Sequence, residues 1–72
     1  MNTEYIYTMA ESFRREGRAL YGKADAVLHD HNLSVTCREA LAANYKTQAS
    51  LAYDQADEID REARRVWRGE AA

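Results

Sequence analysis

Proline and glycine are scarce in this chain. The 72 residues contain no proline and three glycines. A fold of many strands needs a tight turn about every eight to twelve residues, and such turns are built largely from these two residue types. The sequence therefore excludes a many-stranded β architecture and favours long helices.

Cysteine and long apolar segments are scarce as well. The single cysteine, Cys37, has no second cysteine with which to form a disulfide inside the chain. No apolar run reaches the roughly 20 residues of a membrane-spanning helix, and none has the pattern of a signal peptide. We therefore expect a cytoplasmic protein that makes no contact with a membrane.

The chain is short for a protein that folds alone. We expect residues 1–72 to form a single domain, whose ordering costs on the order of 100 kcal/mol of conformational entropy at roughly 1.5 kcal/mol per residue. With 46% hydrophobic residues, 31% charged residues and a net charge of −2, the composition is neither that of a disordered tail nor that of a strongly basic nucleic-acid-binding domain. Oligomerisation is the expected way to complete the core.

Signals for helix ends divide the chain in two. Thr3 is a candidate N-cap for the first helix. Thr36 and Glu39 have the spacing of a capping box that would open the second helix, with Ser34 as the alternative cap. Gly69 is the expected C-terminal stop. We therefore expect helices over about 3–30 and 36–68, joined by a turn over about 31–35.

Large and small apolar residues alternate along one stripe of each expected helix. One set of positions, every seventh residue, is Ile6, Phe13, Leu20 and Val27 in the first helix, with Tyr45, Ala52, Ile59 and Val66 in the second, and all of these except Ala52 are large. The small positions in a hairpin with its turn near Leu33 would face each other as Ala10 with Ala56, Gly17 with Ala49, and Ala24 with Ala42. This pattern is expected where two helix backbones approach closely. The sequence therefore predicts an all-α fold, an antiparallel two-helix hairpin with an Ala/Gly-rich close-packed seam.

Further apolar residues flank this seam. They are Tyr7, Tyr21 and Leu28 on the first helix, with Tyr53 and Trp67 on the second. Two hairpins that bury such edges against each other would form a four-helix bundle. We expect a homodimer of this kind, with a monomer or a hairpin docked on a different protein as the alternatives.

Metal-binding and catalytic residue patterns are weak. His29, His31 and Cys37 have suitable ligand atoms, but the two histidines would diverge on a helix and no second cysteine completes a tetrahedral site. We expect no metal and no cofactor, and we expect Cys37 to be a small half-buried side chain. The dense carboxylates of the second helix fit the pairs Asp57 with Arg61 and Asp60 with Arg64 on a solvated surface. We therefore expect no enzymatic activity.

The arginines form the charged pattern that indicates a function most directly. They are Arg61, Arg64, Arg65 and Arg68 on the second helix, and Arg14, Arg15 and Arg18 on the first. Arginine beside an aromatic residue such as Trp67 suits contacts with phosphates and bases. Binding of RNA or DNA by a hairpin dimer is therefore one alternative function, and a structural subunit of a larger helical assembly is another.

The leading hypothesis is a non-enzymatic protein–protein interaction module. It would be a dimeric hairpin that regulates or inhibits a larger protein, as small phage- or plasmid-encoded proteins often do. The expected partner contacts are the large side chains that the seam leaves unused: Leu51, Tyr53, Trp67 and Tyr5. Leu51 has a second interpretation, because it would complete the dimer core if the second interface lay on its side of the hairpin.

Overall fold

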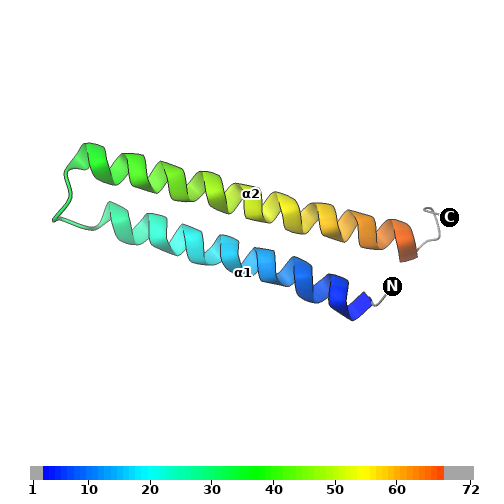
Figure 1. Cartoon of the computed structure of the whole chain (residues 1–72). Coiled ribbons are helices and arrows are strands. Elements are labelled where there is room, and N and C mark those ends of the chain that lie inside the picture. The colour runs from blue at the N-terminus through cyan, green and yellow to red at the C-terminus, as the bar shows by residue number, and fades with distance from the viewer. Residues whose placement is uncertain (1–2, 68–72) are drawn as a thin grey trace.

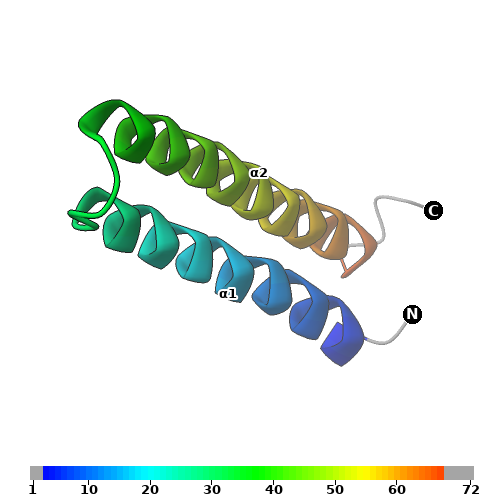
Figure 2. The ribbon, with the colours of Figure 1, turned by 60° about the vertical axis from the view of Figure 1, so that its left-hand side comes forward.

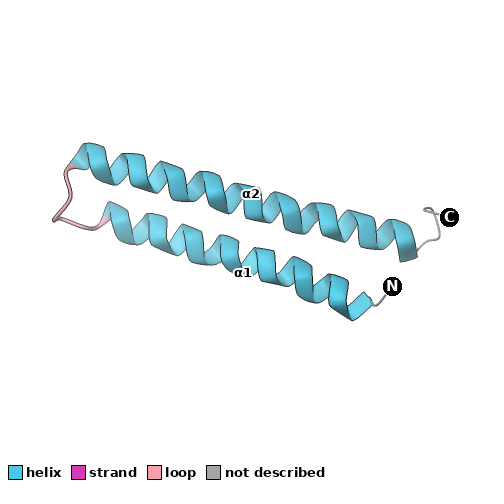
Figure 3. Ribbon diagram, in the orientation of Figure 1, coloured by secondary structure: helices cyan, strands magenta, loops and turns pink. Residues whose placement is uncertain are grey.

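The fold is a hairpin of two long helices. A computed structural model describes residues 3–67, with α1 at Thr3–Leu28 and α2 at Val35–Trp67. The helices lie side by side and run in opposite directions, so that Thr3 and Trp67 share the end remote from the turn (Figures 1 and 2). Within residues 3–67 everything except the short connection is helical (Figure 3). The predicted all-α hairpin is confirmed.

The molecule is one helix thick. Its dimensions are 54 × 17 × 10 Å, and the smallest of them is close to the 10–12 Å diameter of a single helix with its side chains. Two helices in one layer cover only one stripe of each other. Both broad faces of the hairpin therefore point outward.

Ser34 begins α2. Its Oγ accepts a hydrogen bond of 3.1 Å from the backbone N–H of Cys37, and its carbonyl oxygen accepts one of 2.9 Å from the N–H of Arg38. The predicted capping box at Thr36 and Glu39 was wrong, because the helix begins at Val35 and Cys37 takes the position that the box requires for Glu39. The alternative cap is the one that forms.

The turn also closes the end of α1. That helix stops at Leu28, two residues before the predicted boundary, where the Asp30 carboxylate accepts a 3.0 Å hydrogen bond from the N–H of Asn32. Such a bond competes with helix continuation. Arg38 then donates to the Leu28 carbonyl oxygen at 3.4 Å, which satisfies one of the free carbonyls at the helix end. The predicted stop at Gly69 lies outside the described residues.

Small residues make up nearly all of the buried core. The buried positions are Ala10, Gly17, Leu20, Ala24, Ala42, Ala49, Ala52 and Ala56. They include every residue of the predicted seam. No large side chain is fully buried in the described part of the chain. Because alanine removes little apolar surface from water, this core stabilises the hairpin far less than a leucine or phenylalanine core of equal length would.

The ring of Tyr53 lies directly over Gly17. A Cβ atom added to Gly17 would lie 2.7 Å from Tyr53 Cε2 and 2.9 Å from Cδ2, inside van der Waals contact. The ring of Tyr53 also packs against Tyr21, with centroids 6.0 Å apart and planes tilted by 33°. Gly17 is therefore needed to accommodate a tyrosine ring, in addition to the close backbone approach that the sequence predicts. Tyr53 is half-buried by these contacts.

We expect Gly17→Ala to destabilise the hairpin by about 1–3 kcal/mol, because the new methyl group overlaps the Tyr53 ring. In a Tyr53→Ala background the same change should instead stabilise by about 1 kcal/mol, the intrinsic helix preference of alanine over glycine. Gly22→Ala is the matched control, since nothing lies within 4 Å of its added Cβ. Urea unfolding followed by circular dichroism measures all of these changes. Stabilisation by Gly17→Ala equal to that by Gly22→Ala would contradict the ring contact.

Candidate functional site

Two surface grooves lie on one broad face of the hairpin. Their lining includes Ile6, Met9, Phe13, Glu16 and Leu20 from α1, with Gln48, Leu51, Gln55, Ile59, Glu62 and Val66 from α2. Positions that recur every three or four residues share one side of a helix. We call this side of the hairpin the groove face.

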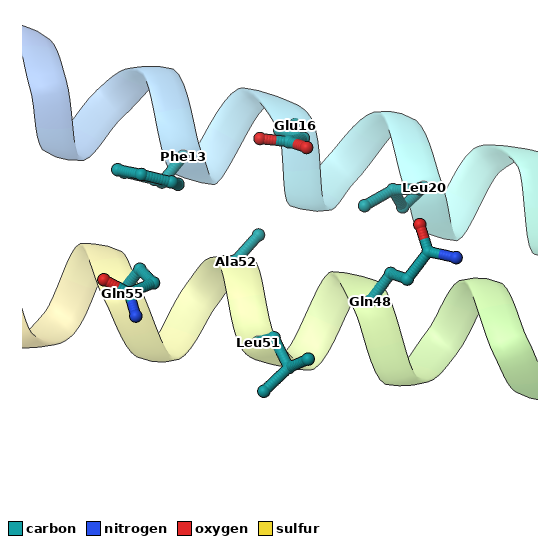
Figure 4. A pocket seen from close by; sticks show the side chains of 7 residues that line it. All are labelled: Phe13, Glu16, Leu20, Gln48, Leu51, Ala52 and Gln55. Carbon is teal, nitrogen blue, oxygen red and sulfur yellow. The ribbon is translucent and has the colours of Figure 1, made fainter.

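The central groove lies at the middle of the groove face. It has a volume of about 250 Å³, and its floor is formed by Phe13, Leu20 and Ala52. Figure 4 shows Phe13 and Leu20 pointing from α1 toward α2, Ala52 pointing back toward α1, and Leu51 pointing away from α1. Leu51 is 60% exposed and occupies the midpoint of Val35–Trp67. A large apolar side chain thus protrudes beside an apolar hollow.

The end groove lies on the same face near the open end of the hairpin. It has a volume of about 180 Å³ and is lined by Met9, Val66 and four neighbours, of which only Glu62 is polar. Met9 and Val66 keep 37% and 40% of their surface exposed. Toward the turn, Leu41 lies seven residues before Gln48, hence on the same side of α2, and is 37% exposed. Apolar surface therefore extends along the whole groove face.

The opposite side, which we call the tyrosine face, carries Tyr7, Tyr21 and Leu28 on α1 and Tyr53 on α2. The three positions on α1 are separated by fourteen and seven residues and so share one side of that helix, and all four are those predicted to form the dimer edge. Tyr7, Tyr21 and Leu28 are 59%, 44% and 36% exposed. Tyr53 is held by Gly17 and Tyr21, so part of this edge packs within the hairpin.

An ion pair joins the two helices on the tyrosine face. The Arg14 guanidinium donates to the Asp60 carboxylate, and the two side chains are 28% and 22% exposed. The predicted pairs of Asp60 with Arg64 and of Asp57 with Arg61 were wrong, because Asp60 turns across the hairpin to Arg14 and neither pair forms among residues 3–67. A charge-assisted hydrogen bond that is partly removed from water holds its partners more firmly than an exposed pair on one helix.

The arginines predicted to bind nucleic acid do not form one free cationic surface. Arg14 is paired with Asp60, Arg18 with Glu11 at 2.8 Å, and Arg65 with Glu62 at 3.0 Å. The hydrogen bond from Arg18 lowers the pKa of Glu11, and the same bond raises the pKa of Arg18. The exposed residues Arg15, Arg61 and Arg64 make no ion pair within residues 3–67. Arg68 lies outside the described residues.

The residues predicted to contact a partner occupy different surroundings. Tyr5 is 65% exposed and Leu51 60% exposed, so both are available to another molecule. Tyr53 is half-buried under the contacts described above. Trp67 is the last residue of α2, and its side chain is not among those described. The sequence did not predict the central groove beside Leu51, since the heptad pattern places Phe13 and Leu20 in the seam without showing how much of their surface stays exposed.

The polar turn carries no ligand cluster. The ring Nδ1 of His29 is 2.8 Å from the carbonyl oxygen of Asp25, and no three His, Cys, Asp or Glu residues in the described part of the chain could together hold a metal ion. Cys37 is exposed, which corrects the expected half-buried position. Neither α1 nor α2, over the residues described, has the length and apolar character to cross a membrane.

Comparisons of the chain with protein-family models, with curated proteins and with solved structures found no match. Any function must therefore be inferred from the two faces themselves.

We expect Arg14→Met to destabilise the hairpin by about 1–3 kcal/mol, because it leaves a half-buried carboxylate unpaired. Arg14→Met combined with Asp60→Leu should recover most of this loss, since the two apolar side chains can pack across the helices. Arg18→Met is the matched control in an exposed pair and should change the unfolding free energy little. Equal losses of unfolding free energy for Arg14→Met and Arg18→Met in urea would show that the pair between the helices stabilises the hairpin no more than an exposed pair does.

Proposed function

We propose that this protein is a non-enzymatic protein–protein interaction module, a homodimeric helical hairpin that regulates or inhibits a larger protein by binding to it. One observation carries the proposal. No large side chain is fully buried in the described hairpin, while nine large hydrophobic residues remain exposed. Such a distribution suits a chain whose apolar surface is covered by other protein chains.

The single-layer architecture supports two different contacts. A molecule 10 Å thick exposes both of its broad faces, and each face carries its own set of apolar side chains. The groove face carries two grooves in which apolar side chains alternate with Glu16, Gln48, Gln55 and Glu62. The tyrosine face has exposed aromatic groups around the fixed ion pair of Arg14 and Asp60. Aromatic residues and arginine are enriched at the centres of surfaces that recognise another protein.

We assign the second copy to the groove face and the target protein to the tyrosine face. The heptad pattern placed Tyr7, Tyr21, Leu28 and Tyr53 at the dimer contact, and it left Leu51 either at the target contact or in the dimer core. The two grooves that both helices line lie on the other face, whereas the hollow beside Tyr7 is lined by α1 alone. Tyr53 already has its packing partners within the hairpin. Tyr7, Tyr21 and Leu28 are thereby left for the target.

The dimer is tested by sedimentation equilibrium. We expect a particle of twice the 8.2 kDa chain mass at micromolar concentration, because the uncovered apolar surface favours association. A mass of one chain throughout, up to roughly the 100 μM at which even weak dimers form, would contradict the proposal. Growth beyond a dimer would instead favour the structural-subunit alternative.

Target binding is tested on the tyrosine face. A protein captured from the encoding organism and reconstituted with the purified hairpin should bind at least about tenfold more weakly to a Tyr7→Ser, Leu28→Ser variant, a loss of about 1.4 kcal/mol. Asp54→Ser, at another exposed position, is the matched control and should bind normally. Circular dichroism verifies that each variant keeps its helices. Equal binding by the Tyr7→Ser, Leu28→Ser variant would place the target elsewhere.

Nucleic-acid binding is the alternative that the arginine pairs disfavour. Three of the predicted arginines are neutralised by carboxylates, and the chain has a net charge of −2. We expect no retention on heparin or on RNA at low salt. Retention that falls steeply as salt rises, and that disappears in an Arg61→Ala, Arg64→Ala, Arg65→Ala variant, would support nucleic-acid binding instead.

A further inference from the structure

We infer that the groove face binds the groove face of a second copy in antiparallel orientation, about a two-fold axis that passes beside Leu51. This inference rests on the proposed homodimer and specifies its interface. In this arrangement the α2 helices of the two copies lie next to each other. The central groove of each copy is covered by the other copy, and Leu41 of each copy packs over the other's end groove.

The groove face is self-complementary at its centre. A two-fold interface places the same patch on both sides, so the patch must contain both a protrusion and a hollow. Leu51 is 60% exposed and stands beside a hollow of about 250 Å³ floored by Phe13, Leu20 and Ala52. Two copies related by the axis therefore bring leucine against leucine at the outer edge of α2, and the remainder of each groove face covers the other copy's hollow.

The position of the axis follows from the length of the hairpin. Leu51 is the midpoint of Val35–Trp67, so an axis beside it lets the two copies overlap along their full length. The outline of the face, 54 by 17 Å, is on the order of 900 Å², close to the roughly 800 Å² that each partner buries in a stable interface of standard size. A contact far from the centre would cover only part of this area.

The orientation follows from the similar spacing of two features on either side of Leu51. Leu41 lies ten residues before Leu51, and the end-groove residues Ile59 and Glu62 lie eight and eleven residues after it. An antiparallel axis therefore brings Leu41 of one copy, about 15 Å from the axis at 1.5 Å per residue, onto the end groove of the other. A parallel arrangement would set the end groove of one copy against the end groove of the other, hollow against hollow.

Polar residues flank the axis in the same symmetric way. Gln48 precedes Leu51 by three residues and Gln55 follows it by four, so each Gln48 faces the other copy's Gln55, and amide side chains can donate to and accept from each other. Glu16, exposed on α1 beside the central groove, is brought near the other copy's Glu16. Glu16→Gln should therefore tighten the dimer about twofold by removing a like-charge pair.

Disulfide trapping in the full chain tests the arrangement. In a Cys37→Ser background, Leu51→Cys should oxidise to a covalent dimer, since the two positions meet at the axis. Ser50→Cys, at the exposed position directly before Leu51, is the matched control and should remain reduced. A Leu41→Cys, Glu62→Cys double variant should form two disulfides between copies, whereas either single variant should not.

Leu51→Lys and Tyr7→Lys provide a second readout on the two faces, since both positions are exposed in the single hairpin. Sedimentation should show that Leu51→Lys raises the dissociation constant of the dimer at least about tenfold, a change of about 1.4 kcal/mol, and that Tyr7→Lys leaves it unchanged.

The outcomes separate the interface from the dimer itself. A dimer that Tyr7→Lys disrupts and Leu51→Lys does not would overturn the groove-face contact, while the proposed homodimer stands. A disulfide between position 51 of one copy and position 16 of the other in a Leu51→Cys, Glu16→Cys variant, with none between the two positions 51, would show the parallel arrangement. That result would overturn the antiparallel one. A chain that stays monomeric at high concentration would overturn both the interface and the homodimer of the proposed function.

Discussion

The seam of alanines between α1 and α2 is the contact on which the rest of the hairpin depends. It places Ala10, Ala49 and Ala56 in complete burial and lets the two backbones approach, but each of these side chains removes little apolar area from water. Leu20 is the one larger residue in the buried set. Close approach is thus obtained at the cost of core volume, and the large side chains are displaced from the seam to the two broad faces.

The displaced side chains have different surroundings on the two faces. On the tyrosine face, contacts within the chain use part of the displaced surface: Tyr53 covers Gly17 and meets Tyr21, and Arg14 reaches Asp60 across the helices. These contacts order the side chains of this face and fix the position of one helix along the other. On the groove face Leu51 has no comparable shelter, since it is 60% exposed. The proposed dimer on that face and target contact on the other both follow from this asymmetry.

Periodicity was sufficient to predict the fold, because heptad spacing of large and small residues depends only on helix geometry. It led to the hairpin and to all six buried seam positions. It did not distinguish Ser34 from Thr36 as the cap, since both have the required hydroxyl and only the backbone bond to Cys37 decides between them. Local spacing also favoured Arg64 as the partner of Asp60, whereas the partner is Arg14, on the other helix. Exposure of Phe13 and Leu51 around a groove depends on the width and tilt of the hairpin, which spacing along one helix does not determine.

We propose that this hairpin lacks a self-sufficient core and is completed by another chain. Thermal unfolding at different protein concentrations tests it most directly, because a fold coupled to dimerisation gains stability by mass action. For such a fold the melting temperature should rise by several degrees when the concentration is raised about a hundredfold, equivalent to about 2.7 kcal/mol. A melting temperature that is high and independent of concentration would show that the single hairpin is stable alone, and would contradict the claim.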